Sequence, residues 1–316
     1  MTKVRQSTVI RKKSVLFVLG GGIGNIIQAT PAIRIASVDW NVDVLLHCNS
    51  TSDLKIFDIP EIHKLYVNTA PRLNYEYQLN GPFTPGKKHK ANKVCKSRIH
   101  YAQHIPEANV YLDLVAQMGM KIDEIPHTKI NIGIKGPYPK NHETVTIYPG
   151  SKYEWSMKRW DKYDELAKHF DNVVVVGTHN DIHSNGKLPW FTKQWHWPKN
   201  TEFFSGTLQE AAFIISKCKM FVGNDGGLAH VAAATSVPTF ILFGPSSTVK
   251  NKPPVPNAKV IAMDIPCRPC QFRTEFPGSK KQIFGANKND CEHHMKCLRD
   301  LSVRNVLKQI KSYSRG

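Results

Sequence analysis

The pattern of apolar and polar residues is clearest over residues 221–246, FVGNDGGLAHVAAATSVPTFILFGPS. A short apolar run is followed by a turn that contains Asp225, Gly226 and Gly227, and then by an Ala-rich stretch. Pro238 ends that stretch, and a second apolar run follows it. This order predicts a buried strand, a glycine turn, a helix that packs closely on a sheet, and another strand.

The N-terminal part of the chain opens with a similar pattern. An apolar run over residues 15–19 leads into the glycine-rich turn GGGIGN, which ends at Asn25, and helical spacing then covers residues 26–37. The next strand is expected over residues 43–47. The glycine spacing is not a clean G-x-G-x-x-G, and no acidic residue follows that strand to hold a ribose. We therefore expect no nicotinamide cofactor.

The rest of the chain continues the alternation of strands and helices. Short strands are expected over residues 53–57, 65–67, 144–147 and 173–176. Helices are expected over residues 99–118, interrupted at Pro106, and over residues 161–170, 208–217 and 301–312. Gly and Pro gather around residues 134–142, which predicts an N-terminal domain of residues 1–136 and a C-terminal domain of residues 137–316. The expected fold class is α/β, with two Rossmann-like, doubly wound domains that face a cleft.

Composition indicates a folded, cytoplasmic protein. The chain has 316 residues, of which 41% are hydrophobic, and this is enough to bury two cores. No stretch of eighteen consecutive apolar residues is present, and the first apolar run is too short for a signal peptide. Seven cysteines without a secretory signal argue against a disulfide framework.

The net charge points to a polyanionic partner. Lys and Arg total 43 against 25 Asp and Glu, which gives a formal charge of +18. Residues 77–106 contain no acidic residue, and they hold a cluster that we call the basic block: Lys87, Lys88, Lys90, Lys93, Lys96 and Arg98. Such a cluster is expected in a loop or at a helix edge that faces an anion, although high charge also serves solubility.

The glycine turn before residue 228 has the features of a phosphate site. Gly226 and Gly227 allow backbone N–H groups to approach an anion, and the positive end of the following helix favours a phosphate. His230, about one turn into that helix, faces the same end. An ordinary strand–helix–strand unit with a tight turn is the alternative.

Four segments, in order, resemble the glycosyltransferase family that contains the lipopolysaccharide heptosyltransferases. They are GGGIGNIIQATPAIR, YPGSKYEWSMKRW, residues 203–247, and the tail from CRPC to CLRDLSVRNVLKQI. The resemblance implies the GT-B fold and inverting transfer of a heptosyl, hexosyl or pentosyl group from a nucleoside-diphosphate sugar, with no metal or other cofactor. It places the donor on the C-terminal domain and the acceptor on the N-terminal domain.

The resemblance also assigns roles to residues by position. The donor-binding residues implied are Ser151, Lys158, Asp225, Gly226, Gly227 and His230. On the acceptor side we expect Gly22 and Gly24 of the glycine turn and, from the charge of the basic block, Lys87, Lys88 and Lys90. A lysine and helix-end amides can stabilise the leaving nucleoside diphosphate in place of a metal.

One residue departs from the family pattern. The glycine turn of the family usually ends in an aspartate that serves as the base, whereas this chain has Asn25, and an amide cannot accept the acceptor's proton. Another group is then the base, with Glu107 and His104 as candidates, or Asn25 only orients the acceptor. A third interpretation is an inactive homologue that binds nucleotide or glycan. We expect Asn25→Asp to keep or raise turnover and Glu107→Gln to lower it.

The C-terminal tail contains a cysteine pattern typical of some metal sites. Its residues, spaced C-x2-C-x20-C-x5-C, are Cys267, Cys270, Cys291 and Cys297. The first pair has the spacing of a zinc knuckle, and the second pair does not. A structural zinc ion, reduced thiols and a disulfide are the alternatives, all away from the chemistry.

The acceptor has two interpretations. The basic block would meet the anionic inner core of lipopolysaccharide in one of them, with peripheral contact at the inner membrane surface. In the other it would track DNA, as in a phage-type transferase that glycosylates a modified base. DNA has support from charge alone, because no helix-turn-helix or base-stacking motif is present. The glycolipid interpretation therefore leads.

Overall fold

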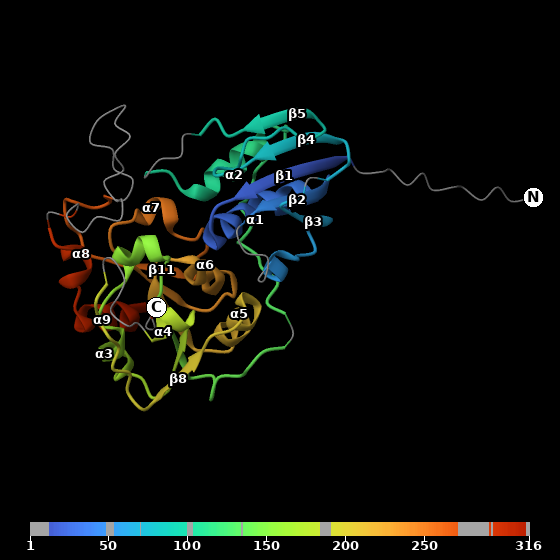
Figure 1. Cartoon of the computed structure of the whole chain (residues 1–316). Coiled ribbons are helices and arrows are strands. Elements are labelled where there is room, and N and C mark those ends of the chain that lie inside the picture. The colour runs from blue at the N-terminus through green and yellow to red at the C-terminus, as the bar shows by residue number, and fades with distance from the viewer. Residues whose placement is uncertain are drawn as a thin grey trace, which may run out of the picture.

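Two parallel β-sheets with helices between and around them form the protein (Figure 1). This computed structural model describes residues 13–48, 54–69, 71–99, 104–133, 135–183, 191–270, 291 and 293–313. The segments up to α2 lie on one side of the molecule, and those from β6 onwards lie on the other. Within the described ranges, no helix has the length and apolar character needed to cross a bilayer.

The first sheet has the strand order β3-β2-β1-β4-β5, and all its strands are parallel. Their bounds are β1 (Ser14–Gly20), β2 (Asn41–His47), β3 (Lys64–Val67), β4 (Tyr75–Asn80) and β5 (Ala91–Lys96). The central strand β1 is buried almost throughout, as expected for a strand covered on both faces. Helices α1 (Ile23–Ser37) and α2 (Glu107–Ala116) pack against each other beside this sheet.

The second sheet has the strand order β11-β10-β9-β6-β7-β8, again all parallel. Its strands are β6 (Val145–Tyr148), β7 (Val173–Val176), β8 (Thr201–Phe204), β9 (Met220–Asn224), β10 (Thr239–Phe243) and β11 (Ala258–Ala262). Counted from β6, this is the order 6-5-4-1-2-3 of a doubly wound sheet. In such sheets a ligand binds where the order reverses, which here is between β6 and β9.

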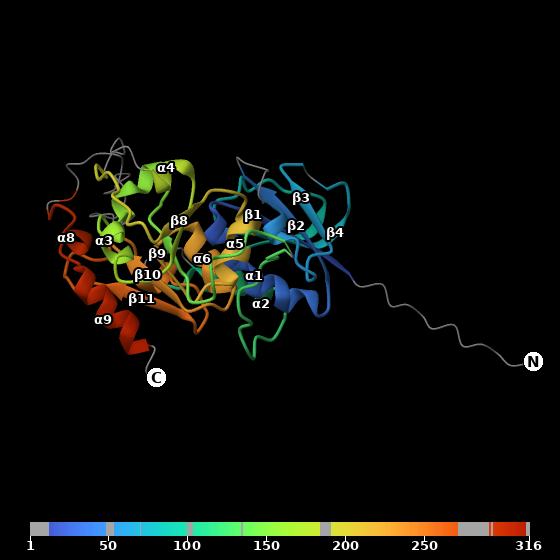
Figure 2. The same ribbon diagram turned by 90° about the horizontal axis from the view of Figure 1, so that it is seen from below.

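Helices of several lengths connect and cover the second sheet. They are η2 (Tyr153–Lys158), α3 (Tyr163–Ala167), α4 (His179–Ile182), α5 (Leu208–Ser216), α6 (Gly227–Ala234), α7 (Thr248–Asn251), α8 (Lys296–Arg299) and α9 (Val303–Tyr313). Helix α9 buries Val306 and Ile310 against this half of the molecule. Figure 2 shows α8 and α9 at the end of the molecule far from β3 and β4.

The two halves meet through helices rather than through the sheets. Helix α1 of the first half contacts α6 of the second, and α6 also contacts α5 (Figure 2). One apolar core joins them, since Ile27 of α1, Val231 of α6 and Ile214 of α5 belong to the same buried cluster. This packing fixes the carboxyl ends of the two sheets relative to each other.

The expected α/β class with two doubly wound sheets is confirmed, and several local predictions are wrong. Residues 54–57 form the short 3-10 helix η1 (Leu54–Phe57) and not a strand, and periodicity does not separate the two in so short an apolar run. Only the part of the predicted helix 99–118 that follows Pro106 is helical among its described residues, with Pro106 as the N-cap. Proline restricts the residue before it and cannot donate a hydrogen bond.

Four strands and part of the basic block also differ from expectation. Strands β4, β5, β8 and β11 were not predicted, because each mixes polar with apolar residues. Lys87, Lys88 and Lys90 lie in the connection between β4 and β5, while Lys93 and Lys96 lie in the edge strand β5. The expected loop is thus found for Lys87, Lys88 and Lys90, whereas Lys93 and Lys96 lie in a strand and not at a helix edge.

The connection between the halves carries the predicted domain boundary. From residue 117 to residue 144, the described part of the chain forms neither helix nor strand. The division after residue 136 falls inside this connection and stays a prediction.

Candidate functional site

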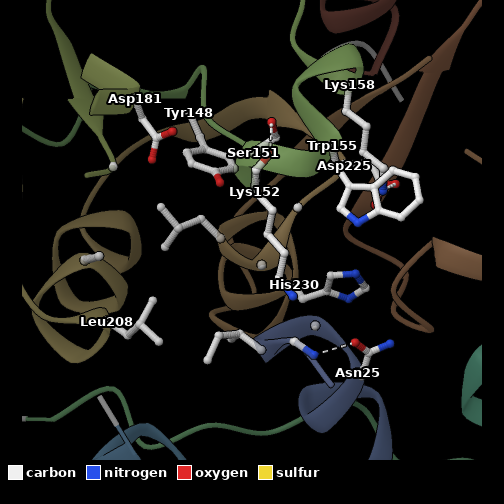
Figure 3. Close-up of a pocket in the computed structure, with 18 of the residues that line it drawn as sticks. Asn25, Tyr148, Ser151, Lys152, Trp155, Lys158, Asp181, Leu208, Asp225 and His230 are labelled. Carbon is white, nitrogen blue, oxygen red and sulfur yellow. Dashed lines mark hydrogen bonds and ion pairs between the residues drawn. The ribbon is translucent and has the colours of Figure 1, made fainter. Parts of the chain in front are cut away.

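A cavity of about 590 Å3 is lined by residues of both halves (Figure 3). All the predicted donor residues line it: Ser151, Lys158, Asp225, Gly226, Gly227 and His230. Four predicted residues of the N-terminal half also line it: Gly22, Gly24, Asn25 and Glu107. The structure thus brings the two glycine turns, which are about 200 residues apart in sequence, to one place.

Some of the predicted site residues lie elsewhere. His104 is exposed in the turn before α2 and is not part of the cavity wall. The basic-block residues Lys87, Lys88 and Lys90 are also exposed and outside the wall. The prediction that His104 is the base is therefore not supported by its position.

Asn25 lies in the first turn of α1, and both the oxygen and the nitrogen of its side-chain amide form hydrogen bonds. The helix begins at Ile23, earlier than expected, so that the glycine turn continues directly into it. Asn25 Oδ1 accepts a hydrogen bond of 2.8 Å from the Gly22 N–H, as Figure 3 shows. Asn25 Nδ2 donates to Glu107 Oε1 at 2.5 Å. The amide therefore links the glycine turn to a carboxylate on another helix.

Glu107 is the first residue of α2, and its carboxylate reaches the cavity. The residue is 2% exposed. The Tyr111 hydroxyl, one turn further along the helix, lies 3.4 Å from Glu107 Oε1. The N-terminus of a helix favours an ionised carboxylate. Glu107 thus supplies a carboxylate beside Asn25, the position at which the family pattern has its aspartate.

Lys158 and Asp225 form a buried ion pair on the opposite wall. Lys158 Nζ lies 2.7 Å from Asp225 Oδ2, and Asn251 Nδ2 donates to the same oxygen at 3.0 Å. Burial alone would raise the pKa of Asp225, but the charge and hydrogen bond of Lys158 outweigh it and hold that pKa below its usual value. The pair places the Lys158 ammonium beside the start of α6, where the Asp225 carboxylate balances its charge.

A second buried ion pair, between Arg159 and Asp181, holds the segment that carries Lys158 in place. The Arg159 guanidinium bonds to the Asp181 carboxylate and to the Ser151 carbonyl oxygen, the latter at 3.0 Å. Asp181 also accepts from the Thr178 backbone N–H at 3.0 Å, which closes the N-terminus of α4. A Cβ atom on Gly150 would lie 2.4 Å from Asp181 Cγ, so only glycine fits there. These contacts join the ends of β6 and β7 beside the cavity.

His230 lies where α1 of one half packs against α6 of the other. A Cβ atom on Gly24 would lie 2.5 Å from His230 Cδ2, so the glycine of α1 allows the ring of α6 to sit against it. Burial disfavours the imidazolium and lowers the pKa of His230 to about 4, with Asp225 opposing and Lys158 adding to the effect. The ring is neutral at pH 7, and its buried Nδ1 has no hydrogen-bond partner among the described residues. A neutral ring can still donate one hydrogen bond to a ligand.

Sequence reasoning missed several residues of the cavity wall. They are Gln28, Lys152, Trp155, Lys250 and Asn251. Figure 3 shows the Lys152 side chain extending from the donor-side loop towards His230 and Asn25. Lys250 follows the GPSS turn after β10. Because ligands of α/β sheets bind at the carboxyl ends of the strands, its place after a predicted strand could have marked it as a site residue.

The tail cysteines lie outside this cavity wall and are all free thiols. Burial and the neighbouring thiols raise the pKa of Cys270 to about 11 and that of Cys297 to about 12. Within the described ranges, no three His, Cys, Asp or Glu side chains are placed to hold a metal ion together. Residues 271–290 and 292, within the same tail, lie outside those ranges. The described geometry therefore favours reduced thiols over a disulfide and does not support the zinc alternative.

Comparison with known proteins gives consistent results. The family described as "Glycosyltransferase family 9 (heptosyltransferase)" matches residues 101–279. Lipopolysaccharide heptosyltransferase 2 of Salmonella typhimurium is 35% identical over 127 residues, which are 38% of this chain and 36% of that protein. Lipooligosaccharide heptosyltransferase 2 of Campylobacter jejuni is 30% identical over 175 residues, 53% of this chain and 50% of that protein. The matches thus span half or less of these relatives.

Solved structures of similar fold cover nearly the whole chain. The ADP-heptose lipopolysaccharide heptosyltransferase II of E. coli has a TM-score of 0.66 at 17% identity, over 95% of this chain and 98% of that one. The dodecameric iron-containing heptosyltransferase TibC of enterotoxigenic E. coli, in complex with ADP-D-beta-D-heptose, has a TM-score of 0.67 at 16% identity. That match covers 96% of this chain and 76% of TibC. At these identities the structures show a shared fold.

Proposed function

The chain belongs to glycosyltransferase family 9 and has the GT-B fold, and from this we propose that it transfers a sugar from a nucleoside-diphosphate sugar to an anionic glycan of lipopolysaccharide type. The observation that carries the proposal is the shared cavity. One wall offers a buried cation and the start of α6, and the opposite wall offers the Glu107 carboxylate.

The donor diphosphate fits the C-terminal wall. Backbone amides at Gly226 and Gly227 and the positive end of α6 would bind its oxygens. Lys158 would balance the charge that develops on the leaving group, at a site already dry enough for electrostatic interactions to be strong. With these groups the departure of the diphosphate needs no divalent metal in this proposal.

The acceptor hydroxyl fits beside Glu107 and Asn25. Glu107 would take the proton from the acceptor hydroxyl. At the same time the hydroxyl oxygen would form a bond to the anomeric carbon of the donor sugar. The bond from that carbon to the diphosphate breaks on the opposite face, which inverts the anomeric configuration. Asn25 would hold the Glu107 carboxylate through its Nδ2, so that it orients the base without being one.

We assign the two halves to the two substrates. Residues 1–136 would form the acceptor domain and residues 137–316 the donor domain, because the proposed base and the proposed phosphate site lie on opposite sides of this division. The basic block would meet the anionic acceptor, and cytoplasmic action with peripheral contact at the inner membrane face suits such a glycolipid. DNA as the acceptor has support from charge alone, and none of the relatives named above is described as acting on nucleic acid.

Ligand binding tests the donor and acceptor classes together. We expect a nucleoside-diphosphate sugar, with ADP-heptose as the first to try, to raise the Tm by several degrees in buffer that contains EDTA, since a ligand that binds only the folded state stabilises it. Binding to duplex DNA is expected to be weak at physiological salt. Tight DNA binding whose logarithm falls steeply with the logarithm of salt concentration would overturn the glycan acceptor. Stabilisation by nucleotide without turnover on any acceptor would favour the inactive homologue.

The cysteine tail allows a separate test of a structural metal. We propose that the four cysteines of the tail are reduced thiols, as the described geometry has them. Elemental analysis of the purified protein should then find metal well below one equivalent. About one equivalent of zinc or iron, lost in a Cys267→Ser/Cys270→Ser variant, would instead establish a structural metal, and TibC is described as iron-containing.

A further inference from the structure

Phe83 is an aromatic residue of the cavity wall with an unusual backbone conformation. It lies in the connection between β4 and β5, and it is 52% exposed. Its φ is 65°, which lies in the left-handed region. That region is uncommon for residues other than glycine, and a bulky side chain there is an outlier that lowers stability. Residues strained in this way persist where the surrounding structure holds them, and they cluster at binding and active sites.

Hydrogen bonds before and after Phe83 hold the connection in place. The Gly81 N–H donates to the Val18 carbonyl oxygen of β1 at 2.9 Å, and the Thr84 hydroxyl donates to the Gly81 carbonyl oxygen at 3.0 Å. The buried Gln78 side chain bonds to two backbone groups of the same connection, a carbonyl oxygen at 2.8 Å and an N–H at 2.7 Å. The strained residue is thus fixed from both sides.

The backbone and the ring of Phe83 both approach the glycine turn that leads into α1. A Cβ atom on Gly20 would lie 2.3 Å from the Phe83 carbonyl oxygen, so this approach requires glycine. A Cβ atom on Gly21 would lie 3.0 Å from Phe83 Cδ2 and 2.9 Å from Asn25 Oδ1. The ring and the Asn25 amide therefore lie against the same glycine, and that amide is hydrogen-bonded to Glu107. Phe83 is placed beside the groups proposed to receive the acceptor hydroxyl.

The chemistry of this part of the cavity suits a sugar ring. Among the described residues of the N-terminal half that line the cavity, Phe83 is the one aromatic side chain. The C–H faces of a pyranose ring pack on an aromatic face, while its hydroxyl groups stay available to polar partners. Lys87, the first lysine of the basic block, is exposed and its Cα atom lies within about 14 Å along the chain. An anionic group attached to the same glycan would be attracted to it.

We propose that Phe83 is an acceptor-binding residue, on whose exposed ring the acceptor sugar stacks with its reacting hydroxyl directed to Glu107. This inference rests on the proposed function, because it takes the acceptor to be a glycan that binds beside Glu107. The left-handed conformation would then be retained because it presents the ring to the cavity, at some loss of stability.

Two other roles for Phe83 make different predictions. If the ring only covers the glycine turn, its removal lowers the Tm and leaves the KM for the acceptor unchanged. If the ring contacts the acyl chains of a glycolipid, its removal raises that KM for an acylated acceptor alone. A ring that binds the sugar makes the acyl chains irrelevant to the effect.

The test measures transfer to a truncated lipopolysaccharide core, both intact and freed of its acyl chains, with the nucleoside-diphosphate sugar that stabilises the protein most. For Phe83→Ala and Phe83→Gly we expect the KM for either form of the core to rise about tenfold, the upper range for one aromatic contact. The KM for the donor should stay within about twofold of the wild-type value. Phe83→Tyr should behave like the wild type, because it keeps the aromatic face.

Thermal melting tests the strain separately from catalysis. Phe83→Gly should melt a few degrees higher than Phe83→Ala, because both lack the ring and only glycine adopts the left-handed region freely. Ser236 provides the matched control, since it is exposed, has a φ of 68° and lies outside the cavity wall. Ser236→Gly should also raise the Tm, but it should leave both KM values unchanged.

An unchanged KM for the acceptor in a folded Phe83→Ala protein would overturn the proposal. A rise seen with the acylated core alone would overturn it too, as would a Phe83→Tyr protein as impaired as Phe83→Ala. A wild-type protein with no transferase activity would instead contradict the proposed function. In that case saturation-transfer NMR of the deacylated core with the wild type and Phe83→Ala still tests whether the ring binds the sugar, and equal signals from the two proteins would exclude it.

Discussion

Glu107→Gln is expected to lower kcat by roughly 100- to 10,000-fold, the usual range for loss of a general base. The substitution keeps the size of the side chain and the hydrogen bond to Asn25 can re-form with the glutamine carbonyl, so the fold should be retained. Affinity for nucleoside diphosphate should change little, because the proposed phosphate site lies on the opposite wall. Steady-state kinetics and calorimetry together measure both quantities. An unchanged kcat would remove Glu107 from the mechanism.

Moving the carboxylate gives a matched control for this prediction. In the double variant Glu107→Gln/Asn25→Asp, the carboxylate and the amide exchange places across the same hydrogen bond of 2.5 Å, and part of the lost turnover should return. Asn25→Asp alone puts two carboxyl groups side by side, where they would share one proton. That variant should keep turnover with an optimum at higher pH. Absence of any recovery in the double variant would mean that the place of the carboxylate, and not only its charge, is essential.

Lys158→Met is expected to have the second large effect, on both stability and donor binding. Removing one partner of a buried ion pair leaves an unpaired charge and costs about 3–5 kcal/mol in the free energy of unfolding. Affinity for nucleoside diphosphate should fall roughly 10- to 100-fold, since a hydrogen bond to a charged group contributes about 1.5–3 kcal/mol. Urea unfolding and calorimetry measure the two effects.

The double variant Lys158→Met/Asp225→Asn separates these effects. Without the carboxylate no unpaired charge remains, so most of the lost stability should return while the donor affinity stays low. The pH dependence provides a further check. The pKa of Asp225 is lower in the folded protein than in the unfolded chain. The ion pair therefore stabilises the folded protein fully above about pH 4, the pKa of an unfolded Asp, and this stabilisation is lost as the pH falls through the lower pKa of the folded state. A stability difference between wild type and Lys158→Met that persists unchanged at pH 2 would contradict this assignment.

Patterns that depend on local spacing were predicted well from the sequence. The segment from β9 to β10 matches its predicted strand, glycine turn, helix and strand closely, because Gly226, Gly227 and Pro238 mark the ends of these elements. Strand β1 and helix α1 were found for the same reason, with the helix beginning three residues earlier than expected. Strands that mix polar with apolar residues, β4, β5, β8 and β11, were missed.

Contacts between distant segments could not be predicted from spacing. Glu107 was a candidate base, but its hydrogen bond to Asn25 depends on the packing of α1 against α2. The meeting of Gly24 with His230 depends in the same way on α1 against α6. Lys250 was missed although it follows a predicted parallel strand, because a lysine in a short helix is usually exposed and only the folded chain buries it.

The most direct test of the account is sugar transfer by the purified protein in the presence of EDTA, with the nucleoside-diphosphate sugar that stabilises it most and a truncated lipopolysaccharide core as acceptor. The wild type and Glu107→Gln are compared, and the anomeric configuration of the product is determined by NMR. The account predicts metal-independent transfer with inversion, lost in Glu107→Gln. Tight nucleotide binding with no transfer, or transfer that continues unchanged in Glu107→Gln, would contradict it.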